Sequence, residues 1–245
     1  MTLALASVID GLAGRGLALA GVANAAAYDS TAPSYARIRS VAPDCRSVLV
    51  VGDSSRNLWD AFLSHMDGCP ETLDGPFPLG EHVHETLEAA RTELSRAMET
   101  DVPLVAFWTA SFARLSLVRL AEAAGVGRVL RCGLLVHPEF GPWVTVWGAF
   151  LLPVELPASS EPPELDCCGT SALSACPADV FRTGEPEWAV CRSCLDGCSV
   201  RAACRYGRSY RYGSSAQQRM MDYLCLKERW TQEEIASAWN DLASI

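Results

Sequence analysis

The sequence contains no long apolar run. No stretch of about 18 residues is free of both charged and turn-forming residues, as a membrane-spanning helix would have to be. The Ala-rich beginning carries Asp10 and Arg15 at the place where an export signal needs an unbroken apolar centre. We therefore expect a cytoplasmic protein that has no membrane partner.

Basic side chains are also scarce. The 20 Lys and Arg residues stand against 29 Asp and Glu residues, and the formal net charge is -9. This balance argues against general affinity for a phosphate backbone, so nucleic acid is a disfavoured partner. With 49% hydrophobic and 20% charged residues, the chain is neither disordered nor fibrous. Its 245 residues allow one core and one extension.

The spacing of apolar residues predicts a mixture of helices and strands. We expect helices at residues 3–20, 55–65, 81–100 and 112–124, and strands at 47–52, 102–108, 133–136 and 143–152. Since the last two strands follow each other closely, the predicted fold class is α+β with a mixed, partly antiparallel sheet. Composition then divides the chain into a core (1–153), a Pro-rich connector (154–165), a Cys-rich segment (166–213) and a helical tail (214–245).

The eleven cysteines are unevenly distributed, with eight of them between residues 167 and 225. Disulfide frameworks of this density belong to small secreted domains, whereas this chain is long, has an odd cysteine count and shows no export signal. The cysteine distribution therefore predicts a metal or cluster site.

Three of these cysteines, Cys191, Cys194 and Cys198, lie within one short loop. Cys176 precedes a proline, as the last cysteine of a ferredoxin motif does. These four thiolates predict one 4Fe-4S cluster. A structural zinc accepts the same four ligands and remains the alternative, with free or redox-active thiols as a third possibility. A second cluster involving Cys168 and Cys204 stays open, because the upstream segment offers too few cysteines at workable spacing.

The most distinctive segment is GLLVHPEFGPWVTVWGAFLL at residues 133–152, which predicts a strand, a tight His-Pro turn and an aromatic-rich strand. It resembles the cobalamin-binding proteins that include epoxyqueuosine reductase, reductive dehalogenases and the cblC-type cobalamin-processing proteins, whose matching segment reads Leu/Ile-His-Pro-x-Tyr/Phe-Gly-x-Trp. The resemblance extends over roughly residues 1–155 through VIDGLAGRGLALAGVANAAAYD, PFPLGEHVHETLEAA and AEAAGVGRVLRCGLLVHP. Residues 191–213 in turn resemble the iron-sulfur module of the reductase and dehalogenase branch.

The resemblance implies a nitroreductase-like core that holds a corrin in a broad cleft, followed by a small ferredoxin-like appendage. The residues that it assigns to cobalamin binding are Gly133, Leu134, Leu135, His137, Pro138, Phe140, Gly141 and Trp143. A proton donor is also needed, and His137, Glu139 and Tyr210 are the candidates, with the choice left open.

Two departures from the reductase branch stand out. Cys204 is followed by Arg205 where a two-cluster protein has proline, and the sequence lacks the C-terminal helical repeats that epoxyqueuosine reductases use toward tRNA. The resulting hypothesis is a cobalamin-dependent oxidoreductase. Its 4Fe-4S cluster would reduce cobalamin to Co(I), take electrons from a ferredoxin or flavodoxin, and serve a small-molecule substrate.

Two other functions remain open at this point. The chain could be a cobalamin-processing and trafficking protein that removes the upper ligand and uses its metal site only structurally. A flavin-dependent reductase on the same fold ranks last, because no specific motif supports it.

Overall fold

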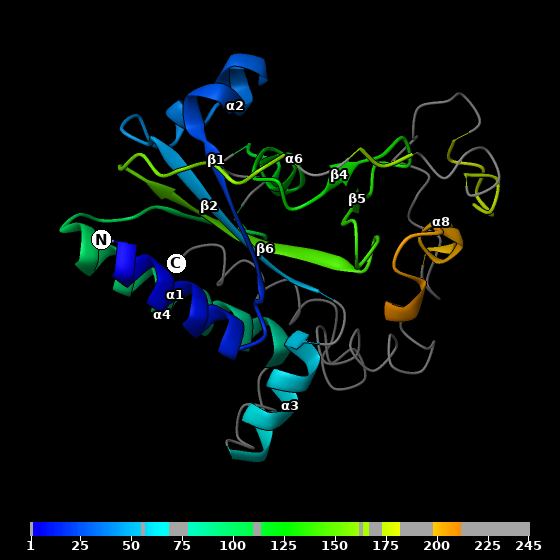
Figure 1. The fold of residues 1–245 in the computed structure, drawn as a ribbon, viewed down its shortest axis with the longest axis horizontal. Coiled ribbons are helices and arrows are strands. Elements are labelled where there is room, and N and C mark those ends of the chain that lie inside the picture. The colour runs from blue at the N-terminus through cyan, green and yellow to red at the C-terminus, as the bar shows by residue number, and fades with distance from the viewer. Residues whose placement is uncertain are drawn as a thin grey trace, which may run out of the picture.

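The computed structural model describes residues 2–54, 57–68, 78–109, 114–161, 164–166, 173–181 and 198–211 (Figure 1). In chain order the elements are α1 (Thr2–Gly14), β1 (Leu19–Asn24), α2 (Ala25–Thr31), η1 (Ser34–Ala36), η2 (Ile38–Ser40), β2 (Ser47–Ser54), α3 (Asn57–Gly68), α4 (Pro78–Met98), β3 (Leu104–Ala106), α6 (Leu117–Ala123), β4 (Arg128–Val129), β5 (Leu135–Val136), β6 (Val144–Leu152), α8 (Ser199–Ala203) and η5 (Arg208–Tyr210). Some of the predicted features lie outside the described residues: the cluster ligands Cys191 and Cys194, the second-cluster candidate Cys168, and the tail from residue 212.

A four-stranded sheet with the order β1-β2-β6-β3 forms the centre of the described structure, beside a two-stranded ribbon of β4 and β5. All of the described strand pairs are antiparallel. The α+β fold class is confirmed, whereas the mixed sheet is wrong for the strands in these ranges. Apolar runs locate buried strands but carry no information about the direction of their neighbours.

Strand β2 is buried along its whole length because both faces of the sheet are covered. Val48 and Val50 point into one hydrophobic cluster, and Leu49 and Val51 point into the other. This alternation explains the continuous apolar run that the sequence shows at this strand.

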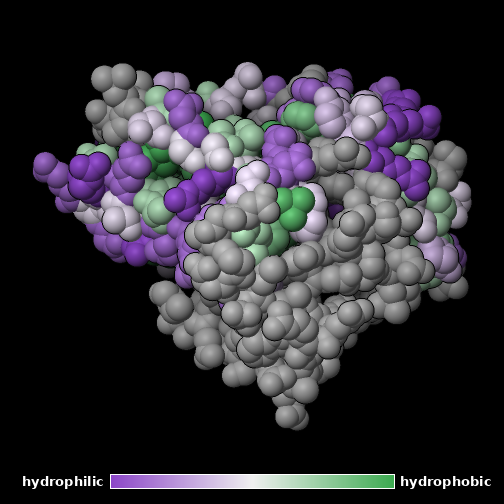
Figure 2. All heavy atoms as spheres, turned by 90° about the horizontal axis from the view of Figure 1, so that it is seen from below, coloured by the Kyte–Doolittle hydropathy of each residue, from purple (hydrophilic) through white to green (hydrophobic). Residues whose placement is uncertain are grey.

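Helices cover both faces of the sheet. In Figure 1, α1 and α4 lie below it, and α6 and α2 lie above it. The side chains of α4 that face the core recur every three or four residues: Leu79, Val83, Leu87, Ala90 and Leu94. Figure 2 views the molecule from below, and most of the described surface there is hydrophilic, with hydrophobic side chains in small separate areas. Within the described residues, no helix combines the length and apolar character needed to cross a membrane.

The first predicted helix was wrong beyond Gly14, because residues 19–24 form strand β1. The chain turns at Gly16, whose φ is 94°, and a Cβ atom there would lie 2.5 Å from the Cα of Leu58. The Ala and Leu residues of this segment are compatible with a helix or a strand, and residues 19–24 form a strand because they pair with β2.

The other predicted elements differ mainly in their ends. Helix α4 starts at Pro78 rather than residue 81, since proline is well suited to the first helical turn. Helix α6 starts at Leu117 rather than residue 112, with Ser116 as its N-cap. The strand predicted at 102–108 is limited to Leu104–Ala106, and the one at 133–136 to Leu135–Val136.

The first part of the connector packs along the outer edge of the sheet. Ser159 exchanges two hydrogen bonds of 2.9 Å with the backbone of Val22, one through its hydroxyl and one through its N–H. Val154 and Leu156 pack against the core. Residues 154–161 therefore protect the edge strand β1 from pairing with another chain.

Candidate functional site

The His-Pro loop is a tight turn between β5 and β6. The backbones of His137 and Gly141 exchange two hydrogen bonds of 2.9 Å. Gly141 has a φ of 62°, in the left-handed region that favours glycine. The loop therefore has a defined backbone that presents the side chains of residues 137–140.

The imidazole of His137 has one nitrogen engaged by the loop. Its Nδ1 accepts hydrogen bonds from the backbone N–H groups of Glu139, at 3.1 Å, and Phe140, at 3.2 Å. The ring also stacks on Phe140 with 4.7 Å between centroids. Burial lowers the pKa of His137, so the neutral ring with its proton on Nε2 is favoured.

Glu139 and Tyr210 meet although they are 71 residues apart in sequence. The Tyr210 hydroxyl donates a 2.6 Å hydrogen bond to Glu139 Oε1, and this bond raises the pKa of the phenol. The Tyr210 ring also contacts Phe140 edge to face at 4.8 Å. The structure thus brings together the three residues predicted as proton donors.

A close backbone contact joins this loop to residues 198–211. A Cβ atom at Gly141 would lie 2.2 Å from the carbonyl oxygen of Tyr206, and one at Gly207 would lie 2.0 Å from that of Phe140. Gly207 has a φ of 63°, so both glycines adopt the left-handed conformation. Only residues without a Cβ fit this contact.

Trp143 follows the loop and is 4% exposed. The guanidinium of Arg201 lies over its ring at 4.7 Å from the centroid, and Arg201 Nε donates a 2.8 Å hydrogen bond to the carbonyl oxygen of Pro142.

The predicted corrin-binding residues before the loop lie in and around β5. The side chain of Leu135 is buried in the hydrophobic core. Gly133, with a φ of 72°, forms the turn before β5 together with Leu134, whose carbonyl oxygen accepts a hydrogen bond from Leu130.

Three of the cysteines that the sequence singles out as possible cluster ligands, Cys176, Cys198 and Cys204, are among the described residues. Cys198 caps α8, and its Sγ accepts the backbone N–H of Arg201 at 3.4 Å, a bond that also suits a thiolate ligand. Cys176 is half-buried at a turn, and Cys204 is buried. The described residues contain no group of three or more metal-ligating side chains, and the four-cysteine set remains a prediction. Thiolates are the donors that iron-sulfur clusters require, so this donor set fits a cluster.

Asp53 is a charged residue of this site that the sequence analysis missed. It is 2% exposed at the end of β2, where it pairs with Thr145. The Trp147 indole N–H donates a 2.8 Å hydrogen bond to its Oδ1. Burial raises the pKa of Asp53 to about 7, although the Trp147 bond and the charge of Arg201 both oppose the shift. The available signal is an acidic residue directly after the apolar strand predicted at residues 47–52.

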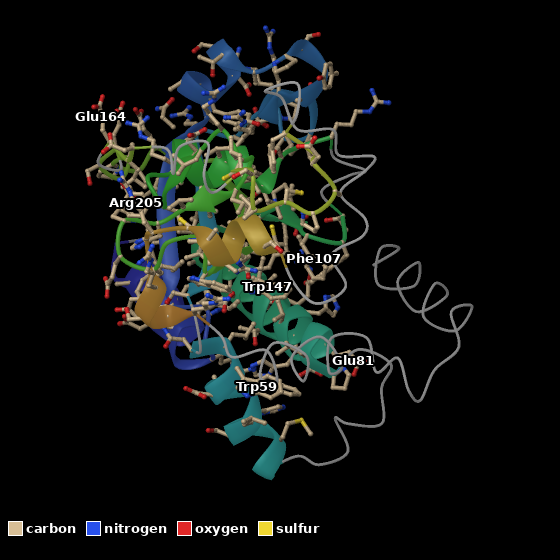
Figure 3. All side chains as sticks on the ribbon, turned by 90° about the vertical axis from the view of Figure 1, so that its right-hand side faces the viewer. Trp59, Glu81, Phe107, Trp147, Glu164 and Arg205 are labelled. Carbon is tan, nitrogen blue, oxygen red and sulfur yellow. The ribbon has the colours of Figure 1, made fainter. Side chains whose placement is uncertain are left out.

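Aromatic side chains extend from Asp53 across the same end of the sheet. Phe107 contacts Trp147 at 5.0 Å and Trp108 at 4.9 Å, both edge to face. Figure 3 looks onto this end of the sheet and labels Trp147 and Phe107. A separate cavity of about 630 Å³, lined partly by Asn24, Arg46 and Pro153, lies at the opposite end of β2 and β6. The aromatic side chains therefore belong to the same end as the His-Pro loop.

No family model matches the chain. An epoxyqueuosine reductase from Gloeobacter violaceus is 30% identical over 173 residues, which cover 66% of this chain and 49% of that protein. One from Synechococcus sp. is 36% identical over 77 residues, covering 31% of this chain and 22% of that protein. The chain thus spans half or less of the length of these curated relatives.

Solved structures give the fold. The epoxyqueuosine reductase of Bacillus subtilis matches with a TM-score of 0.60 and 17% identity, covering 87% of this chain and 68% of that chain. The chain has the fold of the epoxyqueuosine reductases. A B12-trafficking protein of the CblC type from C. elegans shares it, with a TM-score of 0.54 and 13% identity, covering 99% of this chain and 97% of that chain. Both relatives belong to the families that the His-Pro segment resembles.

Proposed function

We propose that this chain is a cobalamin- and iron-sulfur-dependent oxidoreductase. The observation that carries the proposal is the contact between the His-Pro loop and residues 198–211, which include Cys198, in a chain with the epoxyqueuosine reductase fold. This contact brings a predicted cluster ligand next to the predicted corrin-binding loop. When bound, the cluster would supply electrons to cobalt, and cobalt would supply the reducing power.

The residues of the loop would hold the corrin and supply a proton. Phe140 and Trp143 offer aromatic surface, and His137 offers Nε2–H as a neutral donor because its Nδ1 already accepts two hydrogen bonds. Tyr210 keeps its proton at neutral pH, while Glu139 accepts that proton's hydrogen bond and orients the phenol. His137 and Tyr210 are therefore the proposed donors, and Glu139 is the group that positions Tyr210.

The partners of such a reductase are a substrate and an electron donor. We propose a small-molecule substrate and a ferredoxin or flavodoxin. One structural neighbour is an epoxyqueuosine reductase in complex with a tRNA stem loop, and this weighs against the expectation that nucleic acid is disfavoured. The net charge of -9 supports that expectation for this chain. A binding measurement with a tRNA stem loop at two salt concentrations decides between them.

The second candidate is the cobalamin-processing function, because a B12-trafficking protein of C. elegans shares the fold of this chain. In that function the same loop would bind cobalamin, and the cysteines would hold a structural zinc.

Anaerobic purification separates the two functions. The reductase proposal expects a brown protein with about four iron atoms per chain and an absorbance that bleaches with dithionite. Added cobalamin should shift to the spectrum of its base-off form. A colourless protein with one zinc per chain that still binds cobalamin supports the processing function instead, and a protein that binds no corrinoid contradicts both.

A further inference from the structure

Arg201 contacts both segments that meet at the His-Pro loop. Its backbone N–H donates to Cys198 Sγ at 3.4 Å, and its side-chain Nε donates to the carbonyl oxygen of Pro142 at 2.8 Å. Its guanidinium carbon lies 4.7 Å from the centroid of the Trp143 ring. A single residue thus joins a predicted cluster ligand to the loop of the core.

Asp53 lies on the core side of the same contact. Its partner in the β2–β6 register is Thr145, two residues after Trp143, and its carboxylate accepts the Trp147 indole N–H. Among the titratable side chains in the described ranges, Arg201 is the one whose charge acts on this carboxylate, and it favours the ionised form. Asp53 belongs to β2, and its neighbours Thr145 and Trp147 belong to β6. The positive charge of Arg201 comes from α8.

We infer that Arg201 is the positioning residue that holds residues 198–211 on the core, and that buried Asp53 supplies the opposite charge for this position. An ionised carboxylate with 2% exposure carries a large desolvation cost unless a positive charge compensates it. Trp147 and Thr145 supply hydrogen bonds but no charge. The charge of Arg201 favours the ionised form of this carboxylate, although burial still raises its pKa to about 7.

This inference deepens the proposed function, on which it rests for the role of Cys198 as a cluster ligand. The position of residues 198–211 fixes where Cys198 lies relative to the His-Pro loop. Electron transfer to a corrin on that loop would then depend on the charges of Arg201 and Asp53.

Hydrogen exchange followed by mass spectrometry tests the inference on the full chain as purified. The measured quantity is the protection factor of the amides in residues 198–211, corrected for the intrinsic effect of pH. We expect Arg201→Gln to lower this protection on the order of tenfold at pH 8.5, and less at pH 5.5, where Asp53 is protonated. In the D53N background the effect of R201Q should be equal at the two pH values. The matched control is Arg205→Gln, since Arg205 pairs with the exposed Asp166.

Two results would overturn the inference: an R201Q effect no larger than that of R205Q, or an R201Q effect with the same pH dependence in D53N as in the wild type. If R201Q does not fold, Arg201→Lys keeps the positive charge and should retain protection that depends on pH only when Asp53 is present. These exchange measurements require neither cobalamin nor a substrate. Failure of the inference is therefore distinct from failure of the proposed function, which the iron and corrinoid measurements report.

Discussion

Asp53 shows how a single residue can carry information that its sequence context hides. The apolar run before it locates a strand, and a charged residue after such a run usually lies in solvent. Here the strand continues to Ser54, and Trp147 from a strand 94 positions away covers the carboxyl group. The environment of Asp53 depends on long-range pairing, which one-dimensional patterns do not contain.

The raised pKa of Asp53 makes the free energy of unfolding depend on pH. The native pKa is about 7 and the ordinary value is 3.8, so the native state holds this proton more tightly than the unfolded state does. Its contribution to stability is therefore full below pH 4 and is lost as pH rises to about 7. The predicted loss is up to about 4 kcal/mol.

Asp53→Asn should remove this pH dependence, because the amide keeps an oxygen for the Trp147 N–H and carries no charge. We expect D53N to unfold at higher temperature than the wild type at pH 8 and at a similar temperature at pH 4. Asp101→Asn is the control, since that side chain is 79% exposed. If the unfolding temperatures of wild type and D53N change with pH in the same way between pH 4 and pH 8, the raised pKa of Asp53 is refuted.

The role of Tyr210 as a proton donor can be tested by removing its hydroxyl group. Tyr210→Phe removes the 2.6 Å bond to Glu139 and leaves the ring contact with Phe140 in place. If Tyr210 is a proton donor, Y210F should retain cobalamin binding and lose turnover at least tenfold. Visible titration with cobalamin and single-turnover kinetics measure the two properties, and equal losses in both would assign Tyr210 to binding alone.

At the scale of elements, the sequence predicted the helices and strands that have one clear period. Strand β2 and helix α4 follow from continuous burial and from three-to-four spacing. Strand β1 was missed because Ala and Leu between residues 17 and 20 suit either period, and only pairing with β2 selects the strand. The antiparallel sheet was likewise hidden, because strand direction is a property of the assembled sheet.

The contact between the His-Pro loop and residues 198–211 depends on two glycines. Gly141→Ala places a Cβ on the carbonyl of Tyr206 and requires a positive φ, which costs roughly 1–2 kcal/mol before the clash is counted. We expect G141A to expose residues 198–211 and to speed cleavage by trypsin after Arg205 and Arg208 at least tenfold.

The control is Gly11→Ala in helix α1, where a Cβ meets nothing within 4 Å. That substitution should stabilise the chain by roughly 0.5–1 kcal/mol, because alanine is the better helix former. Identical cleavage rates in G141A and the wild type would show that the two glycines do not control this contact.

At the scale of the whole molecule, the His-Pro segment pointed to the families that share this fold, and the solved structures confirm the α+β architecture. The sequence could name the loop residues, but it could not show that Tyr210 reaches Glu139 or that Arg201 covers Trp143. Those contacts join residues about 60 or 70 positions apart, and they belong to the same two segments whose backbones touch at Gly141 and Gly207.

The division into a core and a Cys-rich segment makes a prediction of its own. Cys194→Ser should lose the iron while the core stays folded, because strands β1, β2 and β6 and their helices bury the hydrophobic clusters without that residue. Iron analysis and circular dichroism give the two readouts, with Cys45→Ser as the control that should keep its iron. Global unfolding of C194S would contradict the two-part organisation.

We propose that a redox cluster held by Cys176, Cys191, Cys194 and Cys198 lies next to a corrin on the His-Pro loop. Electron paramagnetic resonance of the reduced protein with cobalamin in its Co(II) state measures this proximity directly. We expect base-off Co(II) and reduced-cluster signals that broaden each other through magnetic coupling. A protein without a cluster signal, or with two signals unchanged from those of the separate centres, would contradict this proposal.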